Sequence, residues 1–515
     1  MRRTILAFFA CVFICSSGIY GRDGIYGTLV PEPEAASGDT VWLDPCIAYR
    51  GSLYLENVHG TEDSPVVVSS RGWKTDGVYA HIDASGELAG IVLENCSNVV
   101  VQGIRITADG RNGRPDHDAM RTGMRCGVLC LSTGEGCSEG IVLDGLLVED
   151  VHMEDRGYSR NPDDVNTANG KEPYGWGIRF ISSGSSRMSG LTVDNCIVRN
   201  VSHTGIKFSG NGIRISRCEV RNCTVQGTGG PGIQMSSVAD AHIHHNVIDR
   251  SGSESDTRNW GRGSGFWCWG SERVLFEYNR MTNANGPNDS AGAHIDYNCR
   301  DVIYQYNFSA NNSGGFCEIL GNNYNCCYRY NISVNDGQRD MSEDNVHYGY
   351  SVFVTGYIGR AAPKGPFNTY IYNNTVYAGP GTVSRIAVTG AANGLLVANN
   401  IFYVMGMSEA ILDKQFKGPA EEAVMKRNLF LSPGCWDSGS HLQDISPVFG
   451  DPGFACPGGL SVLDYIPSGT GIRKRGIRIK PIEGDSRGLF LGLDVDRDIL
   501  GRKVGRRPWF GAVSL

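Results

Sequence analysis

Similar stretches of sequence return along this chain at intervals too short for any one of them to enclose a core. Residues 294–307 (HIDYNCRDVIYQYN) and 318–331 (EILGNNYNCCYRYN) align without gaps at an offset of 24. One repeat earlier, 266–279 (FWCWGSERVLFEYN) is offset by 28, and before it 239–246 (ADAHIHHN) is offset by 33. Units of this size bury their apolar side chains only by stacking on one another. The repeat therefore predicts one long solenoid instead of the three domains that length alone suggests.

The make-up of each repeat indicates β-structure. Every unit holds two or three short β-rich pieces separated by Gly, Asn or Ser, without a helical stripe of ten or more residues. An Asn recurs at one corner and continues downstream in 371–374 (IYNN) and 397–400 (VANN), and we place Cys218 and Cys196 at the same position upstream. Asn tolerates the left-handed conformation, and its amide can bond to the Asn of the next coil. Propeller blades need roughly 40 residues each, so a stacked β-solenoid is favoured.

Composition excludes several classes of protein. Gly contributes 69 of 515 residues, well short of the one-third that collagen needs. With 41% hydrophobic and 20% charged residues, the chain is not of the disordered class. Its net charge of −7 is unfavourable for duplex nucleic acid, and no nucleic-acid partner is predicted. We expect the glycines, such as Gly292, Gly314, Gly315 and Gly321, at coil corners and strand starts, where φ is positive or successive coils stack closely.

The first 21 residues have the features of a signal peptide. Arg2 and Arg3 precede an apolar stretch over residues 5–15, and small residues follow at 16–18. This stretch is too short to span a membrane, and no later segment is apolar enough, so we expect a secreted or periplasmic protein without a transmembrane span. A lipid anchor at Cys15 remains an alternative.

Seventeen cysteines minus two in the expected signal peptide leave fifteen, an odd number. No pair recurs at zinc-like spacing, and most cysteines follow the strand-and-turn pattern. We therefore interpret them as buried packing thiols, with a few disulfides left open.

Three segments resemble a known superfamily. Residues 38–70 look like the first coils, 91–107 (IVLENCSNVVVQGIRIT) like a standard coil, and 494–512 like the C-terminal segment of the secreted right-handed parallel β-helix (pectin-lyase-like) superfamily of polysaccharide-active proteins. The resemblance implies an all-β, single-stranded right-handed parallel β-helix with loop insertions. We expect the catalytic coils over 22–410, and C-terminal coils with a cap over 411–515. The basic stretch within that cap, RKRGIRIK, is interpreted as a solvated edge strand in preference to a polyanion-binding patch.

The sharpest chemical feature is a pair of carboxylates. The gap-free alignment sets His294 opposite Glu318 and Ile295 opposite Ile319. Side chains alternate along a strand, so both isoleucines point inward and His294, Asp296 and Glu318 share the outward face. Coils about 4.8 Å apart and a rise of about 6.6 Å per two residues place Asp296 and Glu318 on a diagonal of roughly 8 Å between Cα atoms. Their carboxyl groups could converge to about 5–9 Å, the range that glycosidases use.

Such a pair can divide into one ionised carboxylate and one proton donor, and His294 could orient Glu318 or tune its pKa. The resemblance to β-helix glycosidases of the β-xylosidase type implies that Asp296 is nucleophile or base and Glu318 the acid, although the two roles could be exchanged. The expected substrate is a polysaccharide or oligosaccharide. No cofactor or metal is predicted, with calcium as an open alternative.

Aromatic and polar residues near this pair are candidates for binding sugar. Trp269 and Tyr297 fall outside the strand alignment and could stack on sugar rings, whereas Trp267, aligned with Ile295, is assigned to the core. Long inserts at 109–126, 154–175, 250–264, 283–291 and 336–350 are expected to wall the groove. Further candidates for substrate binding are Trp260, Asn322, Tyr324, Asp289, Arg339 and His347, with Asp340 and Glu343 in reserve. Asp116, His117 and Asp118 are interpreted as a solvated loop and not as a cation site.

Two other functions stay open. A polysaccharide lyase needs a base to take the proton α to a uronate carboxylate, and His203, Lys207 and His245 are the available bases. A non-catalytic carbohydrate-binding surface protein would keep the aromatic residues and leave the acids dispensable. The sequence indicates neither the sugar nor the oligomeric state.

Overall fold

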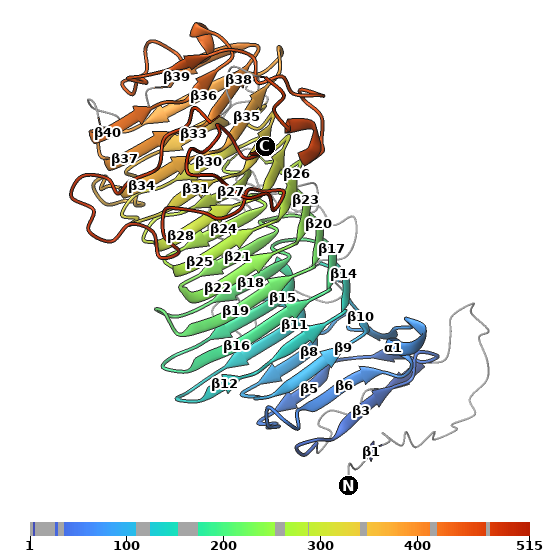
Figure 1. The fold of residues 1–515 in the computed structure, drawn as a ribbon. Helices are drawn as coiled ribbons and strands as arrows, with labels where there is room; N and C mark the ends of the chain where they lie inside the picture. The colour runs from blue at the N-terminus through green and yellow to red at the C-terminus, as the bar shows by residue number, and fades with distance from the viewer. Residues whose placement is uncertain are drawn as a thin grey trace. The chain divides into compact units, whose positions relative to one another are not determined.

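The computed structural model describes residues 4–5, 26–28, 35–109, 124–152, 174–252, 263–286, 288–339, 348–411, 420–469 and 474–514. The chain divides into two compact units, residues 1–225 and 226–515. Strands dominate both units, and each successive coil adds a short strand to each of three parallel sheets, here named A, B and C (Figure 1). Of the residues described, a single four-residue segment, α1 (Trp73–Asp76), is α-helical. The predicted solenoid is confirmed.

In unit 1 the strands follow one another along the stack as coils. Sheet A holds β1 (Thr4–Ile5), β3 (Thr40–Leu43), β6 (Val66–Ser70), β9 (Val99–Gln102), β13 (Val142–Asp144), β16 (Arg187–Asp194) and β19 (Ile215–Arg221), with β12 (Cys137–Glu139) beside β16. Sheet B holds β2 (Tyr26–Thr28), β4 (Ala48–Arg50), β7 (Ala80–Asp83), β10 (Ile104–Ala108), β14 (Leu147–Val151) and β17 (Ile197–Val201). Sheet C holds β5 (Leu53–Glu56), β8 (Ala89–Glu94), β11 (Met124–Ser132), β15 (Tyr174–Ser182) and β18 (Ile206–Ser209).

Unit 2 repeats the arrangement, and β20 (Thr224–Thr228) of sheet B contains the boundary. Sheet A holds β22 (Val238–His244), β25 (Glu272–Glu277), β28 (Arg300–Gln305), β31 (Cys327–Arg329), β34 (Phe367–Tyr372), β37 (Asn393–Ala398) and β40 (Glu421–Lys426). Sheet B holds β23 (Val247–Ser251), β26 (Arg280–Thr282), β29 (Phe308–Ala310), β32 (Ile332–Val334), β35 (Thr375–Ala378), β38 (Ile401–Val404), β41 (Leu429–Phe430) and β42 (Val448–Phe449). Sheet C holds β21 (Ile233–Ser236), β24 (Phe266–Trp269), β27 (Ala291–Ile295), β30 (Gly315–Ile319), β33 (Tyr350–Val354), β36 (Val383–Val388) and β39 (Met407–Ala410). Two 3-10 turns follow, η2 (Pro433–Cys435) and η3 (Val462–Tyr465).

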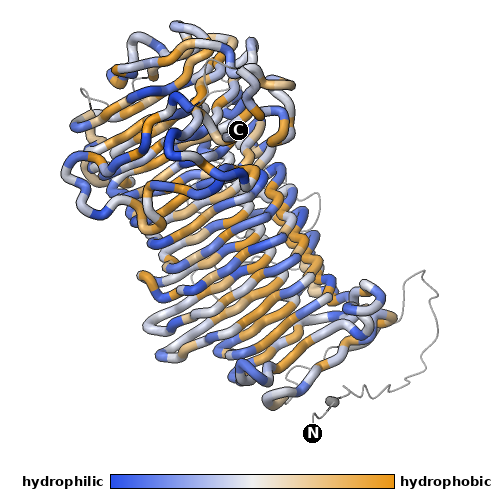
Figure 2. Tube along the Cα trace, viewed as in Figure 1, coloured by the Kyte–Doolittle hydropathy of each residue, from blue (hydrophilic) through white to orange (hydrophobic). Residues whose placement is uncertain are grey.

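The core lies inside the coils because side chains alternate along every strand. In β18, Ile206 and Phe208 are buried, while the alternate residues Lys207 and Ser209 are half-buried, and hydrophobic and polar segments alternate along the tube in Figure 2. Equivalent inward residues of successive coils stack, as Phe180 does on Phe208 with ring centroids 4.4 Å apart. The outward side chains are therefore free to carry chemistry without disturbing the core.

The corner between sheets A and B carries the predicted Asn ladder in unit 2. The backbone N–H of Asn307 donates to Oδ1 of Asn331 at 2.9 Å, and that of Asn331 to Oδ1 of Asn374 at 3.1 Å. The full ladder is Asn246, Asn279, Asn307, Asn331, Asn374, Asn400 and Asn428, which ends on Asp444. One expectation was wrong: the positive φ belongs to the residue before each ladder Asn, for example Tyr306 and Tyr330.

The upstream part of that ladder also needs correction. Cys218 lies within β19, opposite Leu191 of β16, and so belongs to a strand. The corner positions after β16 and β19 are Cys196 and Cys223, each preceded by an Asn with positive φ. Most of the cysteines are buried and none of the described ones forms a disulfide, as expected of packing thiols; Cys46, Cys137 and Cys456 are exposed.

Glycine is required where coils approach closely. A Cβ on Gly314 would lie 1.6 Å from the carbonyl oxygen of Asp289, and Gly315 has a φ of +125°. Both glycines lie at the start of β30, beside the candidate site described below.

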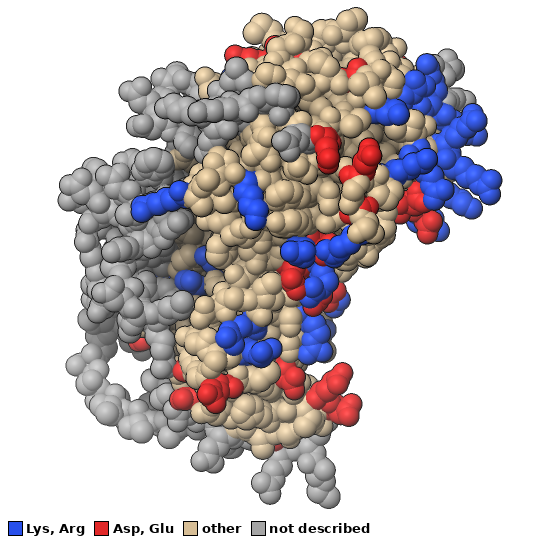
Figure 3. Space-filling view, turned by 90° about the vertical axis from the view of Figure 1, so that its left-hand side faces the viewer, with Lys and Arg blue, Asp and Glu red and all other residues tan. Residues whose placement is uncertain are grey.

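The C-terminal segment covers part of sheet A in unit 2. The guanidinium of Arg329 donates to the carbonyl of Gly492 at 2.7 Å, and Tyr372 Oη to that of Leu493 at 2.7 Å. Residues 474–480 form no strand, so the basic stretch is not the edge strand that we expected. Arg478 there is exposed and paired with Asp494. Figure 3 shows basic side chains gathered at the upper right of the face it presents, and mixed charges elsewhere.

Among the described residues, no helix is long and apolar enough to cross a membrane.

Candidate active site

The outward face of sheet C in unit 2 brings the predicted catalytic residues together. His294 pairs with Glu318 and Ile295 with Ile319 across β27 and β30, as the repeat predicts. Both isoleucines are fully buried in the core. By alternation His294 and Glu318 project outward, and Asp296 follows directly after β27 on the same side.

Trp267 lies on this face too, and its assignment to the core was wrong. It pairs with His294 and not with Ile295, so the offset between β24 and β27 is 27, while β25 and β28 keep the offset of 28. The turn after β27 is one residue longer than the turn after β24, which accounts for the difference. A slip of one residue moves a side chain to the other face of a sheet.

Asp296 is held by two N–H donors. The indole Nε1 of Trp267 donates to Oδ2 at 2.7 Å, and the backbone N–H of Tyr297 donates to Oδ1 at 2.8 Å. The residue is only 6% exposed. Two donors aimed at both carboxylate oxygens stabilise a negative charge at a buried position.

His294 is fixed from the preceding coil. Its Nδ1 lies 2.9 Å from the hydroxyl of Ser264, and its ring centroid lies 5.4 Å from that of Trp267. The ring is buried and sits directly beside Glu318 in the register of the sheet. The His294 ring is therefore held in one orientation beside Glu318.

Glu318 lies between His294 and Phe353 in the outward column and is 8% exposed. Arg339, a candidate from the sequence, comes close enough to interact electrostatically with it. Burial lowers the pKa of the Arg339 guanidinium to about 10, although Asp289, Glu318 and Tyr350 act in the opposite direction. Its Nη2 also donates to the carbonyl oxygen of Asp289. The site thus gathers two carboxylates, an imidazole and a guanidinium.

A row of aromatic rings runs beside Asp296. Trp269 and Tyr297 meet edge to face with centroids 5.9 Å apart, and Tyr357 stands 6.1 Å beyond Tyr297. Tyr357 is 37% exposed. Rings at successive coil positions offer apolar faces that suit sugar rings, and two of the three were candidates from the sequence.

Other candidates lie elsewhere. Tyr324 stacks on Phe367, and the Arg300 guanidinium lies over its ring. Tyr324 pairs with Arg300 and Phe367, the first residues of β28 and β34 in sheet A. Asn322 is at the turn before it, where its Nδ2 donates to Oδ1 of Asn298 at 2.7 Å. The following residues, which the sequence singled out, fall outside the described residues: Trp260, His347, Asp340, Glu343, Asp116, His117 and Asp118.

Sequence reasoning missed Ser264, Trp267 and Tyr357. The signal for Trp267 was present, because the FWCW stretch of β24 alternates inward Phe and Cys with two outward Trp. Ser264 and Tyr357 lie outside strands and have no periodic signal.

The outward face of sheet C in unit 1 has different chemistry. Arg179 pairs with Lys207 across β15 and β18, and both cations lie over the Trp176 ring, at 4.1 and 4.9 Å from its centroid. His203 packs on the same ring with centroids 4.1 Å apart. Burial lowers the pKa of Arg179 to about 10. Two of the bases considered for a lyase, Lys207 and His203, thus meet here. The third, His245, lies at the end of β22 on sheet A of unit 2.

Comparison with known proteins agrees with this architecture. A family model described as the right handed beta helix region matches residues 176–355. The chain is a right-handed parallel β-helix. A search of curated proteins found no match.

The solved structures that match the chain include, at TM-scores below 0.5, a lacto-N-biosidase, an alginate lyase and a mannuronan epimerase. The GH136 lacto-N-biosidase from Eubacterium ramulus has a TM-score of 0.49 and 16% identity over 81% of this chain and 62% of its own. The PL6 family alginate lyase AlyGC has a TM-score of 0.41 and 12% identity over 80% and 51%. The A-module of the Azotobacter vinelandii mannuronan C-5 epimerase AlgE6 has a TM-score of 0.39 and 11% identity over 81% and 91%. The β-helix thus spans less than two thirds of the first two chains.

Proposed function

We propose that this β-helix is an extracytoplasmic glycoside hydrolase that cleaves a polysaccharide or oligosaccharide with Asp296 and Glu318. The observation that carries the proposal is the register of β27 and β30, which puts both carboxylates on one outward face. From that register, the two Cα atoms lie on a diagonal of about 8 Å. The expected leader at residues 1–21 supplies the compartment, and a lipid anchor remains compatible with it. The catalytic coils fall within 22–410, with 411–515 as closing coils and cap.

In the proposed mechanism Asp296 is the carboxylate that stays ionised. Its contacts with Trp267 and the Tyr297 N–H stabilise the charge. Asp296 then attacks the anomeric carbon or activates a water that does so. Glu318 donates its proton to the leaving oxygen, and the ionised Asp296 favours retention of that proton because like charges disfavour ionisation of the second acid.

Arg339 and His294 adjust the proton donor. The Arg339 guanidinium attracts the carboxylate that Glu318 becomes after transfer, whereas Phe353 gives the acid an apolar neighbour. Trp269, Tyr297 and Tyr357 supply stacking surfaces for the flanking sugars. Asp296 thus supplies the negative charge and Glu318 the proton. Arg339 and His294 adjust the proton donor, and the three aromatic rings bind the flanking sugars.

The test compares wild type with Asp296→Asn and Glu318→Gln on a panel of plant and algal polysaccharides and oligosaccharides. New reducing ends without ultraviolet absorbance of an unsaturated product indicate hydrolysis. Both variants keep the volume of the side chain, so folding is expected to be unchanged by circular dichroism. Wild-type rates in both variants would overturn the assignment of these residues.

The pairing of Arg179 with Lys207 favours a second function, a polysaccharide lyase. Lys207 would take the proton α to a uronate carboxylate, while Arg179 would neutralise that carboxylate. The glycosidic oxygen on the β carbon would leave as the carbon–carbon double bond forms, and the protonated Lys207 would give the proton to it. Product absorbance in the same assay that is lost in Lys207→Met, but kept in Glu318→Gln, would favour this function. Loss of hydrolysis in Glu318→Gln alone would exclude it as the main activity. If the wild type and every variant bind glycan and none of them, the wild type included, releases product, the chain is a binding protein.

A further inference from the structure

The C-terminal segment that lies on sheet A in unit 2 is strongly basic. Residues 474–514 contain ten Lys and Arg against five Asp and Glu, although the whole chain has a net charge of −7. Two of the five acids, Asp485 and Asp498, are buried and accept hydrogen bonds from backbone N–H groups of the segment itself. The exposed surface of the segment is therefore more positive than its composition.

This segment contains a cavity of about 320 Å³, which is at the lower end of the range of roughly 300–1,000 Å³ for sites that bind small molecules. The charged residues that line it are Arg478, Lys480, Arg487 and Asp494. The other lining residues are Gly, Pro, Ile and Leu. The cavity thus combines three cations and one carboxylate with an aliphatic wall.

The charges around the cavity do not cancel. Arg478 Nε donates to Oδ1 of Asp494 at 3.2 Å, and both side chains are exposed, so this pair is weak in water. Arg487 Nη2 donates to Oδ2 of Asp301 at 2.8 Å. Lys480 is exposed and forms no ion pair with any residue that the structure describes. The cavity therefore keeps a positive charge for a ligand to neutralise.

Two parts of the cavity wall are fixed to sheet A by buried side chains. Asn325 Nδ2 donates to the carbonyl oxygen of Gly488 at 2.9 Å, and the Arg329 guanidinium donates to that of Gly492 at 2.7 Å. Asn325 and Arg329 are both buried. A wall that is held in place before binding loses little conformational entropy when the ligand arrives.

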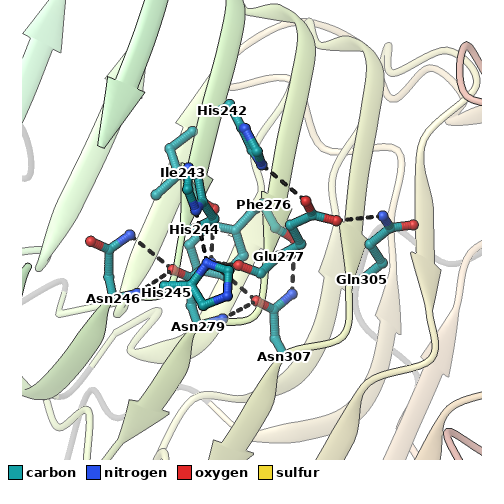
Figure 4. A network of polar contacts seen from close by, with 10 residues as sticks. All are labelled: His242, Ile243, His244, His245, Asn246, Phe276, Glu277, Asn279, Gln305 and Asn307. Atoms are coloured by element: carbon teal, nitrogen blue, oxygen red, sulfur yellow. Dashed lines mark hydrogen bonds and ion pairs between the residues drawn. The ribbon is translucent and has the colours of Figure 1, made fainter. Parts of the chain in front are cut away.

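Arg329 is itself held by a row of side chains across successive coils of sheet A. Its Nε donates to Oε1 of Gln305 at 2.6 Å, and Gln305 Nε2 donates to Oε2 of Glu277 at 2.6 Å. One coil earlier, Nε2 of His242 lies 3.0 Å from Oε1 of Glu277 (Figure 4). The row therefore fixes the guanidinium that holds the cavity wall.

Basic side chains continue along the segment next to the cavity. The backbone N–H of Gly476 donates to the carbonyl oxygen of Pro508 at 3.0 Å, which brings residues 474–478 beside residues 506–508. Outside the cavity, the exposed cations of these two stretches are Lys474, Arg475, Arg506 and Arg507. Such a row of cations suits a polymer with repeated negative charges better than a single small anion.

We propose that this cavity binds one anionic sugar unit of a charged polysaccharide, and that the neighbouring cations hold the units that follow. Lys480 and the two guanidiniums supply charge-assisted hydrogen bonds to a carboxylate or sulfate group. Asp494 accepts from a sugar hydroxyl, and the aliphatic wall covers the C–H groups of the ring. The site lies on sheet A, whereas Asp296 and Glu318 lie on sheet C, so binding here does not depend on the proposed hydrolysis. Residues 474–480, interpreted from sequence as a solvated edge strand, belong to this surface.

Binding is measured on the full chain by biolayer interferometry with immobilised polygalacturonate, dextran sulfate and neutral dextran. We expect affinity for charged polymer and none for dextran, and the tighter of the two charged polymers identifies the anion as carboxylate or sulfate. Lys480→Met keeps most of the side chain but removes its charge, and should weaken this binding about tenfold. Lys74→Met, which makes the same change at an exposed lysine of unit 1, is the matched control and should bind as wild type does.

An affinity that Lys480→Met retains, or that Lys74→Met lowers equally, would overturn the proposal. So would absence of binding to both charged polymers, or tighter binding to anionic lipid vesicles than to either of them. The readout is binding and not product release. Failure of this site is therefore distinguishable from failure of the proposed hydrolase, which is measured by new reducing ends.

Discussion

Sheet C is built from coils of the same design in both units, but its outward faces carry opposite chemistry. In unit 1 the column presents Arg179 and Lys207 over Trp176. In unit 2 the corresponding positions of successive coils present Trp267, His294 and Glu318. The inward residues beside these positions are apolar in both units. Outward chemistry therefore varies independently of the fold, which is why the fold alone does not choose between hydrolysis and elimination.

The corners between sheets A and B differ in the same way. In both units the residue before the corner has a positive φ. These residues are Gly103, Gly145, Asn195 and Asn222 in unit 1, and His245, Tyr278, Tyr306, Tyr330, Asn373, Asn399 and Arg427 in unit 2. The next residue is apolar or a thiol in unit 1, namely Ile104, Leu146, Cys196 and Cys223, and an Asn in unit 2. The amide ladder ties each coil of unit 2 to the next by side-chain hydrogen bonds. The carboxylates thus stand on the more strongly cross-linked coils, which favours a fixed catalytic geometry.

The sharpest test of this contrast exchanges one residue on each face. Glu318→Gln should lower kcat on the cleaved glycan by about 100- to 10,000-fold, because general acid catalysis contributes that much. Lys207→Met in unit 1 should change the same rate less than about twofold, since Lys207 takes no part in the proton transfers proposed for hydrolysis. Reducing-end assays at saturating substrate give both numbers. The reverse pattern would move the active site to unit 1.

The corner contrast is tested by stability. Asn331→Ala removes four buried hydrogen bonds, to the N–H and side chain of Asn307, to the Tyr304 carbonyl and to Asn374. At about 1–3 kcal/mol for each buried group left unpaired, partly relieved by relaxation, we expect a loss of about 3–4 kcal/mol. Cys223→Ala should cost about 1 kcal/mol because only a small cavity forms. Urea unfolding measures both, and equal losses would show that the ladder adds nothing to packing.

The sequence predicted what depends on short-range pattern. Alternation and the recurring Asn of 294–307 and 318–331 were enough for the solenoid, for the outward face, and for the register of His294 and Glu318. It failed where one residue of turn length decides the answer. The longer turn after β27 moved Trp267 to the outward face, and the same sort of miscount assigned Cys218 to the corner that Cys223 occupies. Contacts such as that of Arg339 with Glu318 depend on where an insert returns, which no local pattern specifies.

A second, shorter ladder of unit 2 runs from the N–H of Ala284 to Oδ1 of Asn312 and from the N–H of Asn312 to Oδ1 of Asp336. It is expected to make stability depend on pH. Asp336 accepts from Asn312 and Ser333, yet burial raises its pKa from 3.8 to about 6. The folded state therefore binds this proton more tightly than the unfolded state, so its contribution is full at low pH and is lost as pH rises through about 6. Asp336→Asn should keep the shape without this loss. Its stability relative to wild type should rise by about 2–3 kcal/mol between pH 4 and pH 7.

Urea unfolding at several pH values measures this difference. Asp63→Asn, at an exposed carboxylate of unit 1, is the control and should show no such trend. A flat difference for Asp336→Asn would mean that folding does not raise the pKa of this carboxyl.

The smallest effect separates the two tryptophans that underlie the two faces. Trp267→Phe keeps an aromatic ring but removes the N–H donor to Asp296, and loss of one hydrogen bond to a charged group, at about 1.5 kcal/mol, should lower kcat roughly tenfold. Trp176→Phe keeps a ring beneath Arg179 and Lys207 and should leave hydrolysis unchanged. If Asp296 is the ionised partner, the loss in Trp267→Phe should appear with an acidic limb of the pH–rate profile moved to higher pH, because an Asp carboxylate with one donor fewer holds its proton more tightly. A lower rate with an unmoved profile would assign Trp267 to packing and return the role of ionised carboxylate to Glu318.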